Sequence, residues 1–100
     1  MPHTIHLRDH WTVTPLTGGL VRQARSFGSP LTLDPGETVW LVGTAPGSAT
    51  VSVNDEVVGA IAAAGRFEIK IKTTLMPRNR VWFDVLGGIV TDIALEFRPN

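Results

Sequence analysis

The sequence predicts an antiparallel β-sandwich built from about eight short strands. Apolar and polar side chains alternate along much of the chain, and no window shows the three- and four-residue apolar spacing of an amphipathic helix. Ten glycines and seven prolines divide the 100 residues into segments shorter than ordinary helices. Short strands without a helical period favour two layers whose inner faces enclose the core.

The first third of the chain has the weakest strand signals. Thr4 to Leu7 and Trp11 to Val13 have the composition of short strands, and Leu20 to Arg25 has that of a third. Arg25 to Gly36 is predicted to be a loop. Prolines fall between the predicted strands, where a missing backbone donor costs no ladder hydrogen bond; they are Pro15, Pro30, Pro35 and Pro77.

Glu37 to Val42 differs from the other segments because its odd-numbered and its even-numbered positions are both apolar. Val39 and Leu41 alternate with Trp40 and Val42, a pattern typical of a strand covered on both faces or lying at a sheet centre. We therefore expect a central strand, with Trp40 packed in the core rather than facing a ligand.

Two hairpins are predicted next. Ser48 to Val53 alternates, Asn54-Asp55 tolerates positive φ, and Glu56 to Ile61 returns antiparallel. Further on, the branched and aromatic segment from residue 79 to residue 86 precedes Gly87-Gly88, a two-residue turn without Cβ atoms. The chain from Ile89 onward is expected to return beside that segment.

Two amphipathic strands complete the prediction. Arg66 to Lys72 alternates apolar with charged side chains, and the C-terminal segment repeats this pattern with its apolar residues at odd positions. The apolar faces consist of Phe67, Ile69 and Ile71 in the first strand, and of Ile89, Ile93, Leu95 and Phe97 in the second.

Composition excludes several classes of function. Nine Lys and Arg balance nine Asp and Glu, so the chain has no basic surplus with which to displace counterions from nucleic acid. It has no cysteine for a disulfide, a thiolate nucleophile or a Cys-ligated metal. The first residues lack a signal-peptide pattern, and no apolar run approaches the ~20 residues that span a bilayer. We expect one soluble, cytoplasmic domain over residues 1–100, without nucleic-acid or membrane partners.

No arrangement of residues predicts catalysis, a metal site or a cofactor. His3, His6 and His10 lie close in sequence, but His6 and His10 would share a strand face with Arg8, a permanent positive charge. The carboxylates are scattered, no serine lies in a nucleophile-elbow pattern, and the glycine-containing turns lack the lysine and helix of a phosphate cradle. We therefore expect a chain that is not an enzyme.

Trp82 is the candidate for ligand recognition. It shares a strand face with Arg80 and Asp84. The opposite face carries Val81, Phe83 and Val85. If that apolar face is core, the indole stands on the outer surface beside a guanidinium and a carboxylate, where it can stack on a sugar ring or anchor a protein partner.

Four segments together resemble a known family. They are Leu33 to Val42 (LDPGETVWLV), Ala49 to Asp55 (ATVSVND), Gly65 to Ile69 (GRFEI) and Leu75 to Val81 (LMPRNRV). In this order they resemble the N-terminal sugar-binding domain of family-two glycoside hydrolases, such as β-galactosidase and β-glucuronidase. The resemblance covers residues 25–86 and implies a galactose-binding-like jelly roll.

The resemblance implies more about the fold than about a ligand. Asn54 matches the turn asparagine of the family, interpreted as a residue that tolerates left-handed φ, and Asp55 replaces the usual glycine. The loop that in the enzymes commonly carries a histidine and aromatic or proline residues is here Ala60 to Gly65, which offers a sugar no side-chain hydrogen bonds. The catalytic glutamates of the enzymes lie in a separate barrel domain, so no catalytic residue is carried over.

Two functions of different classes stay open. The first is a non-catalytic carbohydrate-binding-like module whose ligand-binding residues are Trp82, Arg80 and Asp84. The second is a protein-interaction or structural module, favoured by the apolar loop at residues 60–64 and by zero net charge. A third, weaker hypothesis is a remnant domain without a ligand. The first is placed ahead because the implied fold supports sugar sites on its loops.

Overall fold

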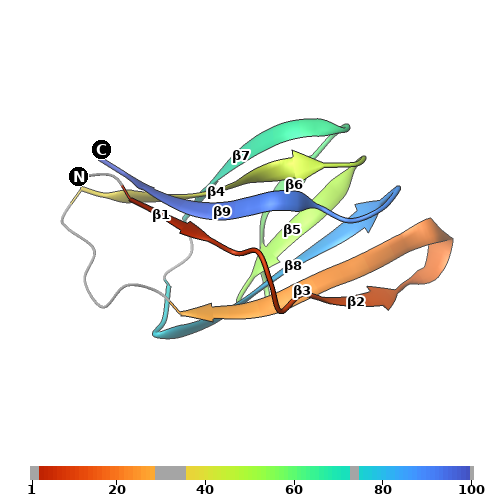
Figure 1. The fold of residues 1–100 in the computed structure, drawn as a ribbon, viewed down its shortest axis with the longest axis horizontal. Helices are drawn as coiled ribbons and strands as arrows, with labels where there is room; N and C mark the ends of the chain where they lie inside the picture. Colours follow the sequence, from red (N-terminus) through yellow and green to blue (C-terminus); the bar gives the residue numbers. More distant parts are fainter. Residues whose placement is uncertain (1–2, 29–35, 73–74, 100) are drawn as a thin grey trace.

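Nine strands form two antiparallel sheets that pack face to face in the computed structural model, which describes residues 3–28, 36–72 and 75–99 (Figure 1). The strands are β1 (His3–His6), β2 (Thr12–Pro15), β3 (Leu20–Gly28), β4 (Thr38–Ala45), β5 (Ala49–Val53), β6 (Glu56–Ile61), β7 (Gly65–Ile71), β8 (Arg78–Leu86) and β9 (Thr91–Arg98). One 3₁₀ turn, η1 (Thr17–Gly19), joins β2 to β3. The predicted all-β sandwich is confirmed, and none of the helical structure in the described ranges could cross a membrane.

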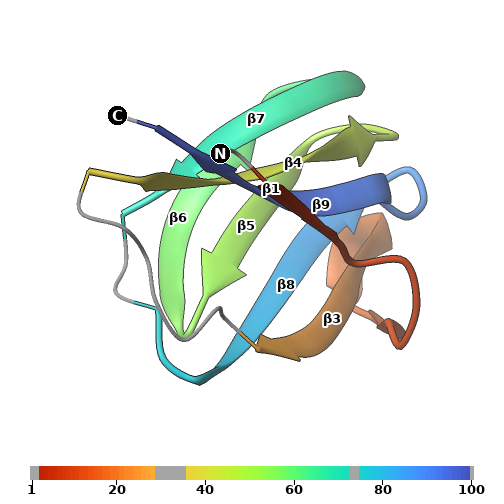
Figure 2. The same ribbon diagram turned by 60° about the vertical axis from the view of Figure 1, so that its left-hand side comes forward.

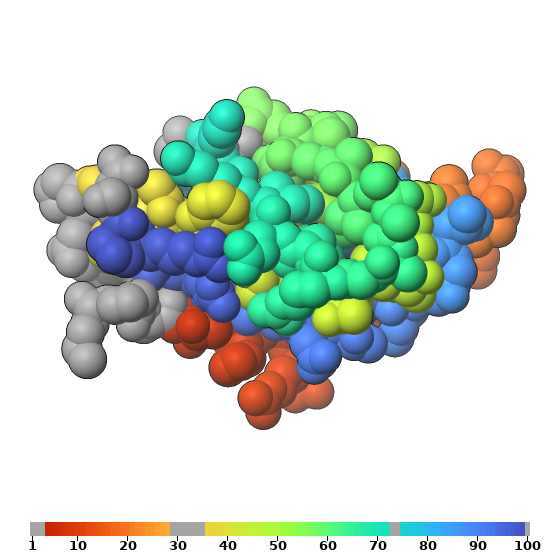
Figure 3. All heavy atoms as spheres, turned by 90° about the horizontal axis from the view of Figure 1, so that it is seen from above, coloured from red at the N-terminus to blue at the C-terminus, as the bar shows by residue number. Residues whose placement is uncertain are grey.

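The two sheets differ in their number of strands, and one of them carries a projecting hairpin. The four-stranded sheet has the order β1-β9-β4-β7, and the five-stranded sheet has the order β2-β3-β8-β5-β6 (Figure 2). β4 is an inner strand between β9 and β7, so the predicted central strand is confirmed. The hairpin of β2 and β3 projects at one end of the molecule, where it is drawn in orange in Figure 3.

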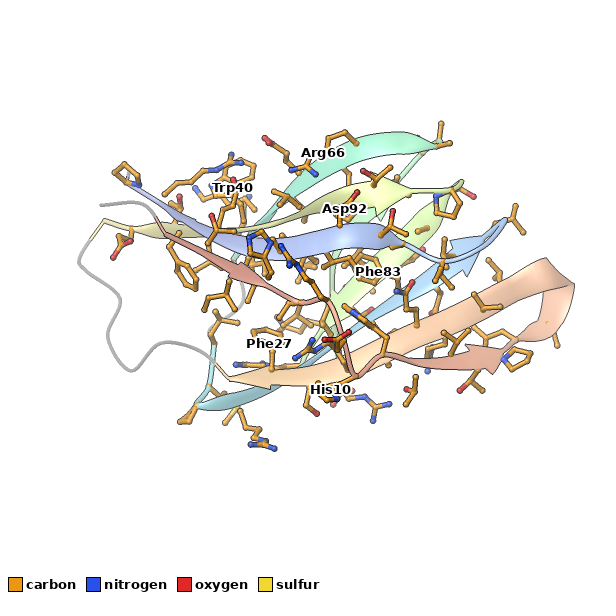
Figure 4. The ribbon with its side chains drawn as sticks, viewed as in Figure 1. His10, Phe27, Trp40, Arg66, Phe83 and Asp92 are labelled. Atoms are coloured by element: carbon orange, nitrogen blue, oxygen red, sulfur yellow. The ribbon has the colours of Figure 1, made fainter. Side chains whose placement is uncertain are left out.

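The core lies between the sheets and is built from alternate positions of the strands. Val81, Phe83 and Val85 of β8 are fully buried, and Phe83 is labelled between the two sheets in Figure 4. The odd positions of β7 and β9 contribute to the same core from the other sheet. The ring of Phe67 meets that of Phe83 edge-on, with centroids 5.8 Å apart. Burial of such side chains stabilises the fold by about 1.5 to 3 kcal/mol each. The period-two burial predicted for these strands is confirmed.

The turn between β5 and β6 is the predicted one. Asn54 and Asp55 have φ values of 50° and 67°, as a type I′ turn requires. The Asn54 side chain donates to Oδ1 of Asn79 at 2.8 Å and accepts the backbone N–H of Arg80 at 2.9 Å. Asn79 is itself buried and bonds both backbone polar groups of Met76. Asn54 is therefore structural, as predicted, and Asn79 fixes the entry into β8.

Gly87 and Gly88 do not form the predicted hairpin. Both have positive φ, but β9 lies in the other sheet, between β1 and β4. Both edges of β8 are already occupied, by β3 and by β5, so no side of β8 is open to a returning strand. The chain instead crosses between the layers, and Ile89, predicted on the apolar face of the last strand, lies before β9 and is half exposed.

A buried glutamine holds this crossing in place. The side-chain amide of Gln23 donates to the carbonyl oxygen of Val90 at 2.9 Å and accepts the Val90 N–H at 2.7 Å. Gln23 is 2% exposed, so both of its polar atoms have partners inside the protein. The glutamine therefore satisfies both backbone polar groups of Val90, which lies in a connection that has no ladder of its own.

The loop predicted from residue 25 onward is wrong for its first residues. β3 continues to Gly28 because β8 offers a pairing partner to every residue of β3. β2 is much shorter and covers β3 only from Val21 to Ala24. The end of β3 is consequently an edge of the sheet, and this difference creates the surface described below. Residues 29–35 of the predicted loop lie outside the described residues.

Candidate functional site

The outer face of the five-stranded sheet carries the three residues predicted as a site. Trp82, Arg80 and Asp84 share the face of β8 that points away from the core. The strand registers place Ala24 of β3 and Ser52 of β5 on either side of Trp82. Both small residues are buried, at 3% and 6% exposure, although they belong to the outer face. Larger side chains therefore cover them, and the Trp82 indole is half-buried rather than fully exposed.

Two arginines flank this indole. The guanidinium carbon of Arg22 lies 5.4 Å from the ring centre and that of Arg80 lies 5.9 Å from it, both within cation–π range. Arg22 also donates two hydrogen bonds to Asp84, from Nε to Oδ1 at 2.8 Å and from Nη2 to Oδ2 at 3.0 Å. These bonds raise the pKa of Arg22 above its ordinary value. The carboxylate of the predicted site is therefore already bound by a cation.

Arg22 is not among the site residues predicted from the sequence. It lies 62 positions from Asp84, and only the register of β3 against β8 brings the two side chains together. The pattern within β8 identified its own residues because alternate residues of one strand share a face. No signal within either strand specified which residue of a neighbouring strand would stand beside them.

The three tryptophans differ in what their indole N–H groups bind. Trp11 donates to the carbonyl oxygen of Leu7 at 2.8 Å, and Trp40 donates to Oγ1 of Thr38 at 3.0 Å. Trp82 has no such acceptor in the described part of the chain. Because every fully buried side-chain nitrogen and oxygen there has a partner, the N–H of Trp82 has some access to solvent. It is the indole donor that a ligand can use.

Trp40 is not in the core, contrary to the prediction. It is half-buried on the outer face of the four-stranded sheet, beneath the Arg98 guanidinium, whose carbon lies 4.7 Å from the ring centre (Figure 4). Arg98 donates to Glu68 at 3.0 Å and to Glu96 at 2.6 Å. These hydrogen bonds raise the pKa of Arg98, and those from Arg98 hold the pKa of Glu68 below its usual value. The Arg98 guanidinium therefore covers the indole on the face where the sequence pattern predicted a second layer.

An open hollow of about 580 Å³ adjoins the face of Trp82. It lies over the end of β3, where β2 no longer covers the sheet. Small residues such as Ser26 and Gly28 leave space there, opposite Arg80 and Arg78 respectively. The polar side chains that line the hollow are those of His10, Thr12, Arg25, Ser26, Arg78 and Arg80.

A second hollow, of about 750 Å³, runs between the β1–β9 edge and the start of β2. Its charged lining is mixed and contains both arginines and carboxylates, namely Arg8, Arg66, Asp9, Asp92 and Glu96. Histidines 6 and 10 also line it, but within the described ranges no three His, Cys, Asp or Glu side chains gather closely enough to hold a metal ion.

Comparison with solved structures identifies the architecture. The chain superimposes on an FMN-binding β-glucuronidase from Facaelibacterium prausnitzii L2-6 with a TM-score of 0.85 and 18% identity, over 100% of this chain and 23% of the enzyme. It matches a Bifidobacterium dentium β-glucuronidase complexed with coumarin-3-O-glucuronide with a TM-score of 0.78 and 14% identity, over 98% of this chain and 30% of the enzyme. The chain has the fold of a β-glucuronidase domain.

This likeness confirms, at the level of the fold, the predicted resemblance to family-two glycoside hydrolases. The chain spans less than a third of each β-glucuronidase. No protein-family model matches the sequence, and no curated protein matches it.

Within this β-glucuronidase-like fold, polar and aromatic side chains converge on the five-stranded sheet rather than on the loop after β6. That loop consists of Ala62, Ala63 and Ala64, all exposed, and it lines neither hollow. The surface formed by Trp82, its flanking arginines and the adjoining hollow is therefore the candidate site.

Proposed function

We propose that this chain is a non-catalytic carbohydrate-binding module whose ligand surface includes Trp82, Arg80 and Asp84. The observation that carries the proposal is the open N–H of Trp82, next to a hollow with hydroxyl and guanidinium donors. An indole presents an apolar face to the C–H groups of a sugar, while nearby polar groups bond its hydroxyls. The fold supports the proposal, since one structural neighbour was solved with a glucuronide.

The ion pair at Asp84 favours binding over cleavage. Glycosidases of the usual kind need two carboxyl groups about 5 to 10 Å apart across the scissile bond, one of them a proton donor. Both oxygens of Asp84 accept hydrogen bonds from Arg22, which fixes the orientation of this carboxylate and occupies both of its oxygens. Such a group can position a ligand but is badly placed to give up a proton to a leaving group.

NMR titration tests the proposal directly. The chain is titrated with neutral and acidic oligosaccharides while the indole N–H signals of its three tryptophans are followed. We expect the Trp82 signal to move at millimolar sugar, with those of Trp11 and Trp40 nearly fixed because their donors are occupied. Uniformly unmoved signals across the panel would remove the proposal.

A protein-interaction module is the second candidate. β6 is an edge strand of the five-stranded sheet, and its Val57 is 70% exposed. An open strand edge with an apolar side chain can pair with a strand of a partner. Light scattering over a hundredfold concentration range tests for self-association, and a constant monomer mass would count against a second copy as that partner.

A further inference from the structure

The hollow beside Trp82 differs from the rest of the described surface in the state of its arginines. Every ion pair found in the described residues involves either Arg22 or Arg98. Arg25, Arg78 and Arg80 line the hollow and take part in none of them. Three arginines without a carboxylate partner among the residues described therefore line one open space.

Arg25 is held in position without losing its charge. Its Nε donates to the carbonyl oxygen of Ser26 at 3.0 Å, its Nη1 donates to that of Asp9 at 2.5 Å, and its guanidinium carbon lies 5.9 Å from the Trp11 ring centre. Carbonyl oxygens orient a guanidinium but leave its unit charge uncompensated, and the Nη2 donors stay available. A positioned cation of this kind favours a bound anion because little side-chain entropy is lost on binding.

The other arginines complete one wall of the hollow. Arg80 lies over the Trp82 indole, and its backbone N–H is fixed by Asn54. Arg78 stands opposite Gly28, which has no side chain to fill the space between the strands. On the other side, His10 lies close to β3, away from Phe83 and the core (Figure 4). The space between these walls is within the usual range for a small-ligand site.

We infer that this hollow binds an oxyanion group, a carboxylate or a sulfate ester, carried by an acidic saccharide. Arg25 and Arg78 hold the oxyanion, Ser26 bonds sugar hydroxyls, and Trp82 with Arg80 contacts the adjoining ring. Planar guanidinium groups match the geometry of such oxyanions. This inference rests on the proposed carbohydrate-binding function and names the class of sugar. A nucleic acid is disfavoured because the whole chain has zero net charge.

Paired ligands that differ only in charge test the inference. Oligogalacturonate is compared with its methyl ester, and dextran sulfate with dextran, by calorimetry and NMR at two salt concentrations. We expect the charged member of at least one pair to bind at least ten times more tightly, with an affinity that falls as salt rises. The pair that responds distinguishes a carboxylate from a sulfate ligand.

The variant Arg78→Gln localises the site. The side chain of Arg78 makes no hydrogen bond or ion pair within the described residues, so its replacement should leave the fold intact while lowering the affinity for the charged ligand about tenfold. Arg66→Gln, an equal change of charge on the other sheet, is the control and should alter affinity less than twofold. Rescue by Arg78→Lys in part, but not in full, would indicate that the planar fork matters.

The outcomes separate this inference from the proposed function. Equal binding of both members of each pair, with Arg78→Gln unchanged, overturns the inference and leaves a neutral-sugar module. Binding of none of the four ligands overturns both. Inorganic sulfate or phosphate that binds as tightly as the charged saccharides overturns the assignment to a saccharide.

Discussion

The two outer faces of the sandwich each carry a tryptophan beside an arginine and a carboxylate, but they differ in what is left unbound. On the four-stranded sheet, one arginine covers Trp40 and bonds two glutamates, and the indole N–H is bound by Thr38. On the five-stranded sheet, Arg22 and Arg80 flank Trp82, and Asp84 binds only Arg22. The described residues contain no acceptor for the Trp82 indole N–H.

The types of residue in a surface cluster therefore do not by themselves identify a ligand-binding site. Tryptophan, arginine and a carboxylate occur together on both faces, and one of the two clusters is closed by its own hydrogen bonds. What distinguishes the Trp82 face is an excess of cations and an open donor next to a hollow. An unfilled hydrogen-bonding capacity can be completed by a ligand, whereas a filled one only stabilises the fold.

The largest expected difference is in binding. Trp82→Ala should lower the affinity for the saccharide at least tenfold, because it removes both the stacking surface and the free donor. Trp40→Ala should change the affinity less than twofold. Calorimetry with the ligand selected from the charged pairs measures both, and equal losses in the two variants would contradict the distinction between the faces.

Stability should show the opposite order. Trp40→Ala is expected to lower the free energy of unfolding by about 2 kcal/mol, since it removes a half-buried indole together with its bond to Thr38. Trp82→Ala is expected to cost about 1 kcal/mol, because its N–H has no protein partner to lose. Urea denaturation followed by circular dichroism gives both values. A larger cost at Trp82 would indicate that this indole is primarily structural.

Changing the Arg22–Asp84 pair should move binding in two directions. Asp84→Asn keeps a side chain that can bond sugar hydroxyls but removes the negative charge beside the two arginines, so it should strengthen binding of an acidic saccharide about threefold. Arg22→Gln removes a cation and frees the carboxylate, so it should weaken binding about threefold. Titrations at low salt reveal both effects. Arg98→Gln, on the other face, serves as the control, and an effect there of the same size would contradict the assignment.

The smallest effect concerns acid stability on the closed face. Arg98 lowers the pKa of Glu68, so this carboxylate contributes stability that is present above its unfolded pKa, near 4.3, and lost as pH falls through its folded pKa. Glu68→Gln should therefore be slightly less stable than the wild type at neutral pH and equal to it in strong acid. Because the pair is exposed, the difference is expected to be small. A difference that persists unchanged in acid would contradict this account.

Alternation along single strands predicted much of the fold. It identified the buried faces of β7, β8 and β9, and the asparagine turn after β5, because both depend on residues that are close in sequence. The predicted hairpin at Gly87-Gly88 was wrong because turn composition reports only on adjacent residues. The partner of a strand depends on which sheet edges are free, and both edges of β8 are occupied. The prediction for Trp40 was wrong because the guanidinium of Arg98, and not a second layer, covers its ring.

The candidate site was predictable only in part for the same reason. One strand, β8, supplies Trp82, Arg80 and Asp84, and the alternation of side chains along that strand predicted that they share a face. Arg22 and Arg25 come from β3, and their positions depend on how far β3 extends along β8. The hollow exists because β2 is shorter than β3, a mismatch between two strands that neither strand's own pattern expresses.

The buried Gln23 connects the two sheets through hydrogen bonds, since it lies on β3 and bonds Val90, the residue before β9. Apolar packing tolerates small sliding of one sheet over the other, but a side-chain amide bonded to both the N–H and the carbonyl oxygen of Val90 permits very little. Gln23 lies on β3 between the two arginines that this strand contributes to the candidate site. The bonds of Gln23 thereby fix the positions of Arg22 and Arg25 relative to the other sheet. A substitution at residue 23 would therefore alter the spacing of these cations, although Gln23 lies on the opposite face from the Trp82 surface.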